Sequence, residues 1–261
     1  MSGYRLPDEL DVVAEGSLRI VRLNRPDHLN ATNHALHQGL AELFPQIDED
    51  AEARAVVITG NGSAFSAGGD FAYIDEMVSN PELRTISLNH GKQIVTGMIG
   101  CRVPIIAAVN GPAVGLGCSL VALSDIAFIA QSAHLADPHV LLGLVAADGG
   151  PITWPLLTSL MLAKEYALTG ERIPADRAAA IGLVNHVCPD DEVMGAALAC
   201  ARKIAALPRQ AVEDTRRVVN LHLQRAVLAT IDFALTAENR SFDSAELRTN
   251  LDRLRAGKDS G

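Results

Sequence analysis

Two glycine-rich segments, each following a short run of apolar and β-branched residues, most constrain how this chain can fold. Gly60–Asp70 follows Ala55–Thr59, and Asn110–Cys118 follows Ile105–Val109. Runs of this composition bounded by glycine are typical of β-strands, and a helical pattern opens near Leu116 after the second loop. The alternation of strand and helix continues along the chain. We therefore expect an α/β fold.

The remaining elements are predicted from the spacing of apolar residues. Further strands are expected at Leu18–Leu23, Ile126–Ala130 and near Val184–Val187. Helices are expected at Asn33–Ile47, Arg84–Ile99, Val193–Ala206, Gln210–Asn220 and Leu223–Ala237. Pro208 is expected to separate the helix at 193–206 from the helix at 210–220. The last ~65 residues contain no strand pattern. Residues 1–195 are therefore predicted to form the core, and residues 196–261 a helical C-terminal segment.

The composition excludes several classes of protein. Hydrophobic residues make up 48% of the 261 residues and charged residues 20%, which is typical of a globular chain. The formal net charge is −9 and no lysine- or arginine-rich stripe is present, so nucleic acid and anionic membranes are poor partners. Polar residues and glycines interrupt the apolar stretch Val103–Ala130, so we expect it to be core rather than a membrane helix.

No cofactor, metal or disulfide is expected. The four cysteines show neither CxxC nor metal-ligand spacing and are predicted to be free thiols, as in a reducing compartment: Cys101, Cys118, Cys188 and Cys200. His34 and His37 lie three residues apart on a predicted helix, but no third ligand is evident. Charged residues occupy the N-terminal stretch where a signal peptide needs an apolar core, so a cytoplasmic location is expected.

Both glycine loops can present backbone N–H groups to a ligand. Glycine allows close approach of the backbone, and the N-terminus of a helix offers unpaired N–H groups. Two such loops facing one cavity would give the two convergent donors that a developing oxyanion needs. Neither loop contains GxxxxGK[ST], and neither gives a convincing GxGxxG pattern. The alternative is that both loops are only tight turns.

Several blocks of sequence resemble the crotonase (enoyl-CoA hydratase/isomerase) superfamily, in that family's order and spacing. They are LNRPDHLNA at 23–31, AFSAGGD at 64–70, NGPAVGLGCSLVALSD at 110–125 and ADPHVLLGL at 136–144, with weaker blocks at Leu168–Gly170 and Ala178–Val184. Together they cover roughly residues 10 to 240. The resemblance implies a spiral of ββα repeats, in which the backbone N–H groups of Gly69 and Leu116 form an oxyanion hole for an enolate.

The resemblance also implies an assembly and a substrate. Members of the superfamily usually form trimers or dimers of trimers, so the C-terminal helical segment is expected to serve as a trimerisation or lid element. An acyl-CoA is the first expectation for the substrate, with Arg25, Ala31, Ala67, Asp70 and Ser119 as candidate contacts. However, the positions that often carry phosphate-binding lysines hold Asp27 and Ser63. A carboxylate near phosphates is repulsive, which disfavours CoA unless other basic residues compensate.

The chain departs from the hydratase pattern at both catalytic glutamates. Ser119 and His139 stand where hydratases carry the two carboxylates that hold and deprotonate water, so hydration is expected to be weak or absent. His139 is predicted to be a general base, with Asp148 either as its orienting partner or as a proton shuttle. This pair is similar to that of the β-diketone hydrolase branch, such as 6-oxocamphor hydrolase, which cleaves a carbon–carbon bond. Glu238 matches an active-site glutamate of that branch.

Two other functions stay open at this point. An enoyl-CoA isomerase or weak hydratase would use Asp148 alone to move protons. A non-catalytic member would bind CoA without turnover and would not need the His139–Asp148 pair. An RNA-binding role is disfavoured because this acidic chain lacks a basic helix.

Overall fold

The computed structural model describes residues 3–258 and contains two sheets. The larger sheet has the strand order β1-β2-β3-β4-β6-β9. Its strands are β1 (Leu10–Glu15), β2 (Leu18–Leu23), β3 (Ala55–Gly60), β4 (Ile105–Val109), β6 (Ile126–Ala130) and β9 (His186–Cys188). The first two form an antiparallel hairpin and all later neighbours pair in parallel. The smaller sheet consists of β5 (Ala113–Val114), β7 (His134–Ala136) and β8 (Ile173–Pro174).

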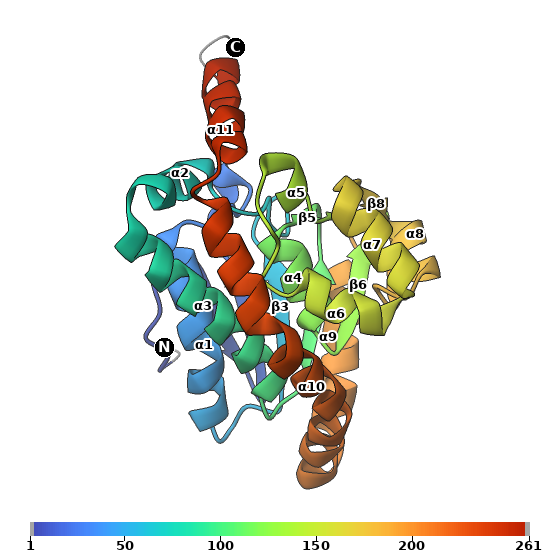
Figure 1. Ribbon diagram of the computed structural model, residues 1–261. Coiled ribbons are helices and arrows are strands. Elements are labelled where there is room, and N and C mark those ends of the chain that lie inside the picture. The colour runs from blue at the N-terminus through green and yellow to red at the C-terminus, as the bar shows by residue number, and fades with distance from the viewer. Residues whose placement is uncertain (1–2, 259–261) are drawn as a thin grey trace.

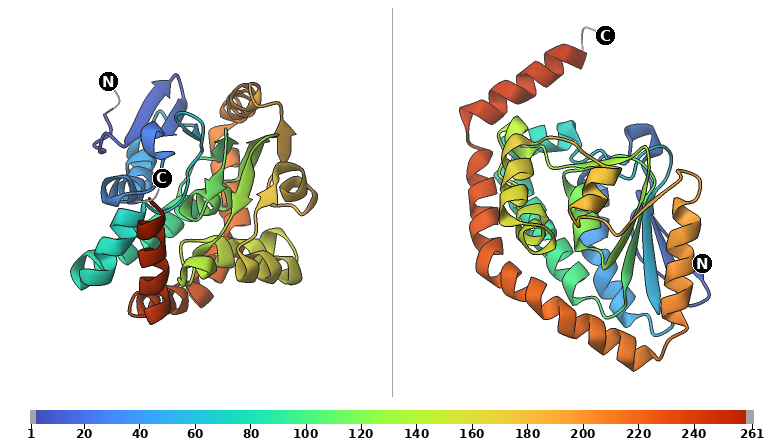
Figure 2. Two further views of the ribbon diagram at one scale, coloured as in Figure 1. Left: turned by 90° about the horizontal axis from the view of Figure 1, so that it is seen from above. Right: turned by 90° about the vertical axis from the view of Figure 1, so that its right-hand side faces the viewer.

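Helices cover both faces of the larger sheet (Figures 1 and 2). They are α1 (His34–Glu49), α2 (Phe71–Ser79), α3 (Pro81–Gly100), α4 (Leu116–Leu123), α5 (His139–Leu142), α6 (Gly150–Leu157), α7 (Leu160–Thr169), α8 (Ala175–Ala180), α9 (Val193–Ala205), α10 (Arg209–Ser241) and α11 (Ala245–Lys258), with a short 3₁₀ turn at Pro26–His28. Helix α9 packs against β3, β4 and β6, whereas α1, α3 and α10 pack together on the opposite side.

The α/β prediction is confirmed, and most predicted elements are present. The strand expected near Val184–Val187 begins two residues later, at His186. The two helices predicted at 210–220 and 223–237 are wrong as separate elements, because α10 runs unbroken through both. No proline or glycine lies between them, so the sequence contains nothing that would end the helix there. The predicted core boundary at residue 195 falls inside α9.

The stretch from Val103 to Ala130 forms strands and a buried helix, as expected. Its elements β4 and α4 are buried along their whole length, and β6 is buried except at its first residue. Within residues 3–258, α10 alone is long and apolar enough for a membrane span, with an 18-residue window of mean hydropathy 1.2. Helices of soluble proteins share this property, so it is weak support for a membrane contact. All four cysteines are free thiols.

Helix α10 is fixed to the core by one buried guanidinium. Arg216 donates to the carbonyls of Met98 at 2.8 Å and Ile99 at 3.2 Å, and also to the carbonyl of Cys101. Its Nε pairs with Asp125 at 2.7 Å. The contacts satisfy unpaired carbonyls at the end of α3. Because a helix rises about 1.5 Å per residue, this anchor also sets the position of Glu238, about six turns further along α10.

Candidate active site

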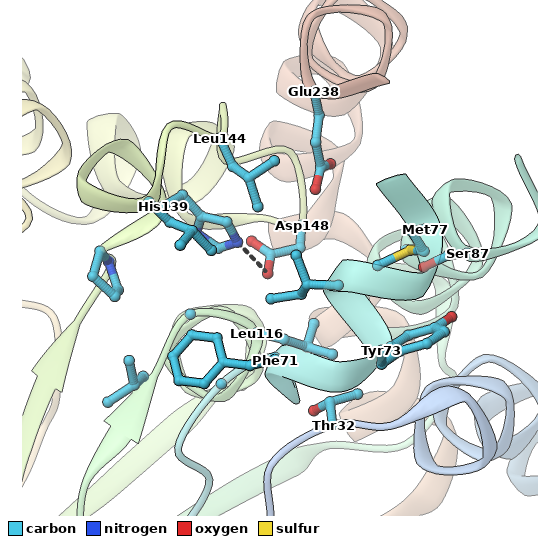
Figure 3. A pocket seen from close by; sticks show the side chains of 18 of the residues that line it. Thr32, Phe71, Tyr73, Met77, Ser87, Leu116, His139, Leu144, Asp148 and Glu238 are labelled. Atoms are coloured by element: carbon cyan, nitrogen blue, oxygen red, sulfur yellow. Dashed lines mark ion pairs between the residues drawn. The ribbon is translucent and has the colours of Figure 1, made fainter. Parts of the chain in front are cut away.

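A cavity of about 490 Å³ opens between the two glycine loops and the helices α2, α3, α5, α10 and α11. Its walls are mainly apolar, with Phe71, Ile74, Met77, Leu88, Leu144 and Phe242 among the lining residues. This volume lies within the range of small-molecule sites. Figure 3 shows that His139, Asp148 and Glu238 project into the cavity from separate parts of the chain.

The two glycine loops lie side by side at the floor of this cavity. The N–H of Ser66 donates to the carbonyl of Pro112 at 3.1 Å, and the N–H of Val114 donates to the carbonyl of Ser66 at 2.9 Å. Gly68 has a φ of +90°, and a Cβ at this position would lie 3.1 Å from the carbonyl oxygen of Val114. Only glycine fits here without strain. The close pairing brings Gly69 and Leu116 to the same cavity wall.

The backbone amides of Gly69 and Leu116 are available to a ligand. Leu116 is the first residue of α4, so its N–H is one of those that a helix leaves unpaired. Among residues 3–258, neither of these two N–H groups has a hydrogen-bond acceptor. Both residues line the cavity. The pair therefore has the arrangement expected of an oxyanion hole, in which donors are fixed before charge develops.

A proline substitution would remove one of these donors selectively. Proline is tolerated at the first position of a helix and lacks the N–H group. We expect Leu116→Pro to lower kcat by about 10²–10³-fold, the usual cost of losing one oxyanion donor. Leu116→Met keeps the amide and the apolar bulk and is the matched control. Steady-state kinetics and circular dichroism of both variants would test this, and a fully active, folded Leu116→Pro enzyme would contradict the role of the amide.

His139 is held by a carboxylate that the sequence interpretation did not select. Its Nδ1 lies 2.5 Å from Oδ1 of Asp137, whose side chain is only 1% exposed. Asp137 precedes His139 by two residues in the Asp-Pro-His block, and that spacing was the available signal. The predicted orienting residue, Asp148, faces the other ring nitrogen, with Oδ2 3.7 Å from Nε2. The orienting role therefore belongs to Asp137, and Asp148 lies on the cavity side of the ring.

Ser119 holds Asp148. Its hydroxyl donates to Oδ1 of Asp148 at 2.8 Å, and Ser119 is 1% exposed. Ser119 does not line the cavity, and its role as a substrate contact stays a prediction. The bond leaves Oδ2 of Asp148 facing His139. The gap of 3.7 Å between Oδ2 and Nε2 is too long for a direct hydrogen bond, and a group of the reaction can lie between them.

The four ionisable groups of the site, Asp137, His139, Asp148 and Glu238, have pKa values shifted in different directions and by different causes. Burial lowers the pKa of His139, but the carboxylates of Asp137 and Asp148 outweigh it and raise that pKa to about 10. Burial raises the pKa of Glu238 to about 8. Burial also raises the pKa of Asp148, against the opposing effect of His139. For Asp137, burial alone would raise the pKa, but the adjacent imidazolium lowers it.

These shifts change the roles expected from the sequence. His139 was predicted to be a neutral base near pH 7, but a pKa of about 10 makes it a cation there. Asp148 is then the group beside it that can accept a proton. Glu238, with a pKa of about 8, is largely protonated near neutrality and can donate one. Pairs of titratable groups with separated pKa values are the usual arrangement for acid–base chemistry.

The remaining predicted contacts form a structural clasp next to the cavity. Arg25 pairs with Asp70 at 3.1 Å and also donates to the carbonyl of Ala31. Asp70 caps α2 by accepting from the N–H of Ala72 at 3.0 Å. None of the three residues of this clasp lines the cavity, and their substrate contacts stay predictions. Ala67 does line it, as expected.

Asp137, His139 and Asp148 also have the composition of a metal site. Their ligand atoms lie within 4.8 Å of one another. However, Nδ1 of His139 already makes a 2.5 Å bond to Asp137, and Nε2 faces Asp148. A metal would have to break this chain of contacts, so a triad of alternating charges, with one hydrogen bond between His139 and Asp137, describes the geometry better. The paired amides and this triad together define a crotonase-type enzyme site.

Comparisons with known proteins give the family. Residues 14–255 match the family model Enoyl-CoA hydratase/isomerase, so the chain belongs to this family. It is 34% identical over 229 residues to the Short-chain-enoyl-CoA hydratase of Clostridium acetobutylicum, covering 87% of this chain and 85% of that protein. It is 36% identical over 217 residues to the mitochondrial Delta(3,5)-Delta(2,4)-dienoyl-CoA isomerase of Homo sapiens, covering 78% of this chain and 65% of that protein.

Solved structures show the same fold. An enoyl-CoA hydratase/isomerase from Mycobacterium paratuberculosis superposes with a TM-score of 0.94 at 59% identity, covering 96% of this chain and 100% of the other. A β-diketone hydrolase from the cyanobacterium Anabaena superposes with a TM-score of 0.83 at 28% identity, covering 90% of this chain and 94% of the other. The predicted crotonase fold and enzyme class are confirmed, and the β-diketone hydrolase branch is represented among the structural neighbours.

Proposed function

We propose that this enzyme hydrolyses a carbon–carbon bond of a β-dicarbonyl compound, either a free diketone or an acyl-CoA. The observation that carries the proposal is the Asp137–His139–Asp148 triad, which lies beside two free backbone amides. By the family resemblance, Ser119 and His139 stand where hydratases carry their two glutamates. The similarity to the Anabaena β-diketone hydrolase supports it. Glu238 adds a protonated carboxyl group to the same cavity.

The groups present can perform every proton transfer in this reaction. A water molecule held by Asp148 attacks one carbonyl carbon and gives its proton to the Asp148 carboxylate. The His139 imidazolium stabilises the charge that forms on the oxygen of the attacked carbonyl. When that oxyanion collapses, the C–C bond breaks and its electron pair forms an enolate, whose oxygen is held by the amides of Gly69 and Leu116.

The reaction is completed by proton donation to carbon. Protonated Glu238 donates to the enolate carbon, which leaves a ketone and a carboxylic acid as the products of adding one water. The proton on Asp148 then replaces the one that Glu238 has lost, so both groups return to their starting states. The two carboxyl groups thus act as base and acid because their surroundings shift their pKa values differently.

A second candidate is an enoyl-CoA isomerase. The raised pKa of Asp148 suits a carboxyl group that takes a proton from one carbon and returns it to another. The human dienoyl-CoA isomerase is among the relatives. In this reaction no water is consumed, and the Asp137–His139 pair is not needed for attack.

Paired assays distinguish these candidates. Purified enzyme would be given a cyclic 1,3-diketone, crotonyl-CoA and a 3-enoyl-CoA, with products followed by mass spectrometry. The proposed function predicts ring opening of the diketone with a mass gain of one water. Rapid hydration of crotonyl-CoA that persists in His139→Ala would overturn it, and rapid double-bond migration without water uptake would favour the isomerase.

The pH dependence of turnover should show two limbs. On the acidic side, kcat should fall as Asp148 becomes protonated and loses its role as base. On the alkaline side, kcat should fall above about pH 8, because Glu238 ionises there and loses the proton that it donates. Glu238→Gln should lower kcat by about 10²-fold and remove the fall above about pH 8, leaving only the fall near pH 10 at which His139 loses its charge. Profiles from acid to alkaline pH, with exposed Glu82→Gln as control, would test this; a fall near pH 8 that persists in Glu238→Gln would contradict it.

We further propose that the C-terminal helices mediate a homotrimer or a dimer of trimers. Helix α10 exposes large apolar side chains, with Leu228 83% and Phe233 78% exposed in the isolated chain. Surfaces of this kind usually mark protein contacts. Sedimentation would then give three or six times the chain mass of 27.6 kDa, whereas a monomer at micromolar concentration would contradict the proposal.

A further inference from the structure

The cavity has a second polar wall, which the proposed chemistry does not use. It is formed by His37 of α1, Tyr73 of α2 and Ser87 of α3, all of which line the cavity. Figure 3 shows Tyr73 and Ser87 on the other side of Leu116 and Met77 from His139. The reacting groups and this second wall therefore lie at opposite ends, separated by apolar side chains.

These three side chains are buried and connected to one another. Nδ1 of His37 lies 3.2 Å from the Ser87 hydroxyl, and the Tyr73 hydroxyl lies 3.3 Å from Nδ1 of His34. The ring of His37 meets the edge of Tyr73 with centroids 6.3 Å apart. His37, Tyr73 and Ser87 are 9%, 7% and 5% exposed. Buried polar groups normally have their hydrogen-bonding capacity satisfied. Because these groups line a cavity, we expect a ligand to supply part of their hydrogen bonding.

The His37–Ser87 pair carries a hydrogen that it does not use internally. Burial lowers the pKa of His37 to about 3, and the neighbouring His90 and His34 add to the effect, so the ring is neutral. A neutral imidazole and a hydroxyl together carry two polar hydrogens, and their mutual bond uses one. Whichever tautomer is present, one N–H or O–H is left as a donor. Within residues 3–258, Nε2 of His37 has no hydrogen-bond partner.

We propose that this wall, formed by His37, Tyr73 and Ser87, is a specificity subsite for a neutral oxygen substituent, a ketone or a hydroxyl, at the far end of the substrate. The inference rests on the proposed function and narrows its substrate class to β-dicarbonyls with such a distal group on an apolar skeleton. The hydrogen left over on the His37–Ser87 pair donates to the distal oxygen. The Tyr73 hydroxyl lies beside the pair and completes the polar end.

The ligand at this end should be uncharged. Apart from His37 and Tyr73, the titratable residues that line the cavity are His139, Asp148, Glu238 and Arg253, which come from α5, the loop after it, α10 and α11. The polar end is built instead from α1, α2 and α3, and its titratable neighbours are His34, His37, His90 and Tyr73. The carboxylates of Glu42 and Glu76 act on His90 and Tyr73 but do not line the cavity. A carboxylate or ammonium group buried here would have no counter-charge, which is costly. A neutral oxygen substituent needs no counter-charge when it is buried there.

A matched pair of substrates tests the subsite. Cyclohexane-1,3-diones with a 2-alkyl chain would be compared with analogues of equal length that end in a hydroxyl group, over several chain lengths. At the best length we expect kcat/KM to favour the hydroxylated substrate by about tenfold, the effect of one buried hydrogen bond. The double variant His37→Phe/Ser87→Ala removes every donor of the pair and should reduce this ratio to near one. Ser79→Ala, an exposed serine at the end of α2, is the matched control and should keep the ratio.

The outcomes separate a ligand subsite from simple packing. If His37 and Ser87 only hold α1 against α3, the double variant His37→Phe/Ser87→Ala will reduce kcat/KM for both substrates equally, and the proposal is then wrong. A wild-type ratio near one at every length would also overturn it.

Failure of the proposed function has a different signature, because neither diketone would then be cleaved. In that case calorimetry with the corresponding monoketones gives the answer. About tenfold tighter binding of the hydroxylated ketone, abolished in the His37→Phe/Ser87→Ala variant, would support the subsite, and equal or no binding of both ketones would contradict it.

Discussion

Replacing His139 with alanine is expected to lower kcat for diketone cleavage by at least about 10³-fold. The imidazolium lies between two carboxylates, 2.5 Å from Asp137 and 3.7 Å from Asp148. Without it, the largest effect that offsets burial at Asp148 is lost and only its hydrogen bonds, among them the one from Ser119, still lower that pKa, so the pKa rises further and less of the base is ionised. The charge on the attacked carbonyl oxygen also loses its cationic partner.

Two further variants make this result interpretable. His139→Gln keeps a polar side chain of similar size and should still lose about 10²-fold or more, because it carries no charge. His28→Ala removes an exposed histidine from the loop before α1 and should behave like the wild type. Since removal of one partner from a buried charged pair is destabilising, thermal unfolding must show that His139→Ala is folded at the assay temperature. A folded His139→Ala enzyme with near wild-type kcat would rule out the proposed mechanism.

Asp137→Asn should have the next largest effect, a loss of about 10²–10⁴-fold in kcat, the scale seen when the carboxylate that orients a catalytic histidine is neutralised. The substitution removes the strongest of the effects that raise the pKa of His139, which should then fall from about 10 towards its ordinary value. KM should change far less, because Asp137 does not line the cavity.

The measurement on Asp137→Asn must distinguish a role in positioning His139 from a role in stabilising the fold. Titration of the His139 ring by NMR gives its pKa directly, and a purely structural role would lower the melting temperature while leaving that pKa high. Asp232→Asn, an 80% exposed carboxylate on α10, is the matched control. Asp137→Asn with unchanged kcat and an unchanged His139 pKa would contradict the orienting role.

Much of the fold could be predicted from local patterns. The strands β2, β3, β4 and β6 are short apolar runs bounded by turn residues, and these signals depend only on neighbouring positions. The C-terminal helices were harder, because the number of helices between Pro208 and Phe242 depends on packing. The Arg216 anchor and the contacts of α10 with α3 and α6 keep it continuous over 33 residues.

Three of the four ionisable residues of the site were predictable, but Asp137 and the connections among the four were not. His139, Asp148 and Glu238 come from three segments, and the resemblance to a family placed them in one cavity. Which carboxylate faces which ring nitrogen depends on side-chain directions that motif spacing does not specify. The protonation of His139 depends on burial and on two carboxylates at once, so an ordinary pKa of about 6.5 was a poor guide.

The most direct test of the account is the fate of isotopic water. Wild-type enzyme would be incubated with a cyclic 1,3-diketone in ¹⁸O-labelled water, and the product examined by mass spectrometry and NMR. Water attack on a carbonyl followed by C–C cleavage predicts a ring-opened keto acid with one ¹⁸O in its new carboxylate. Recovery of intact diketone, together with efficient hydration of crotonyl-CoA by the same preparation, would contradict it.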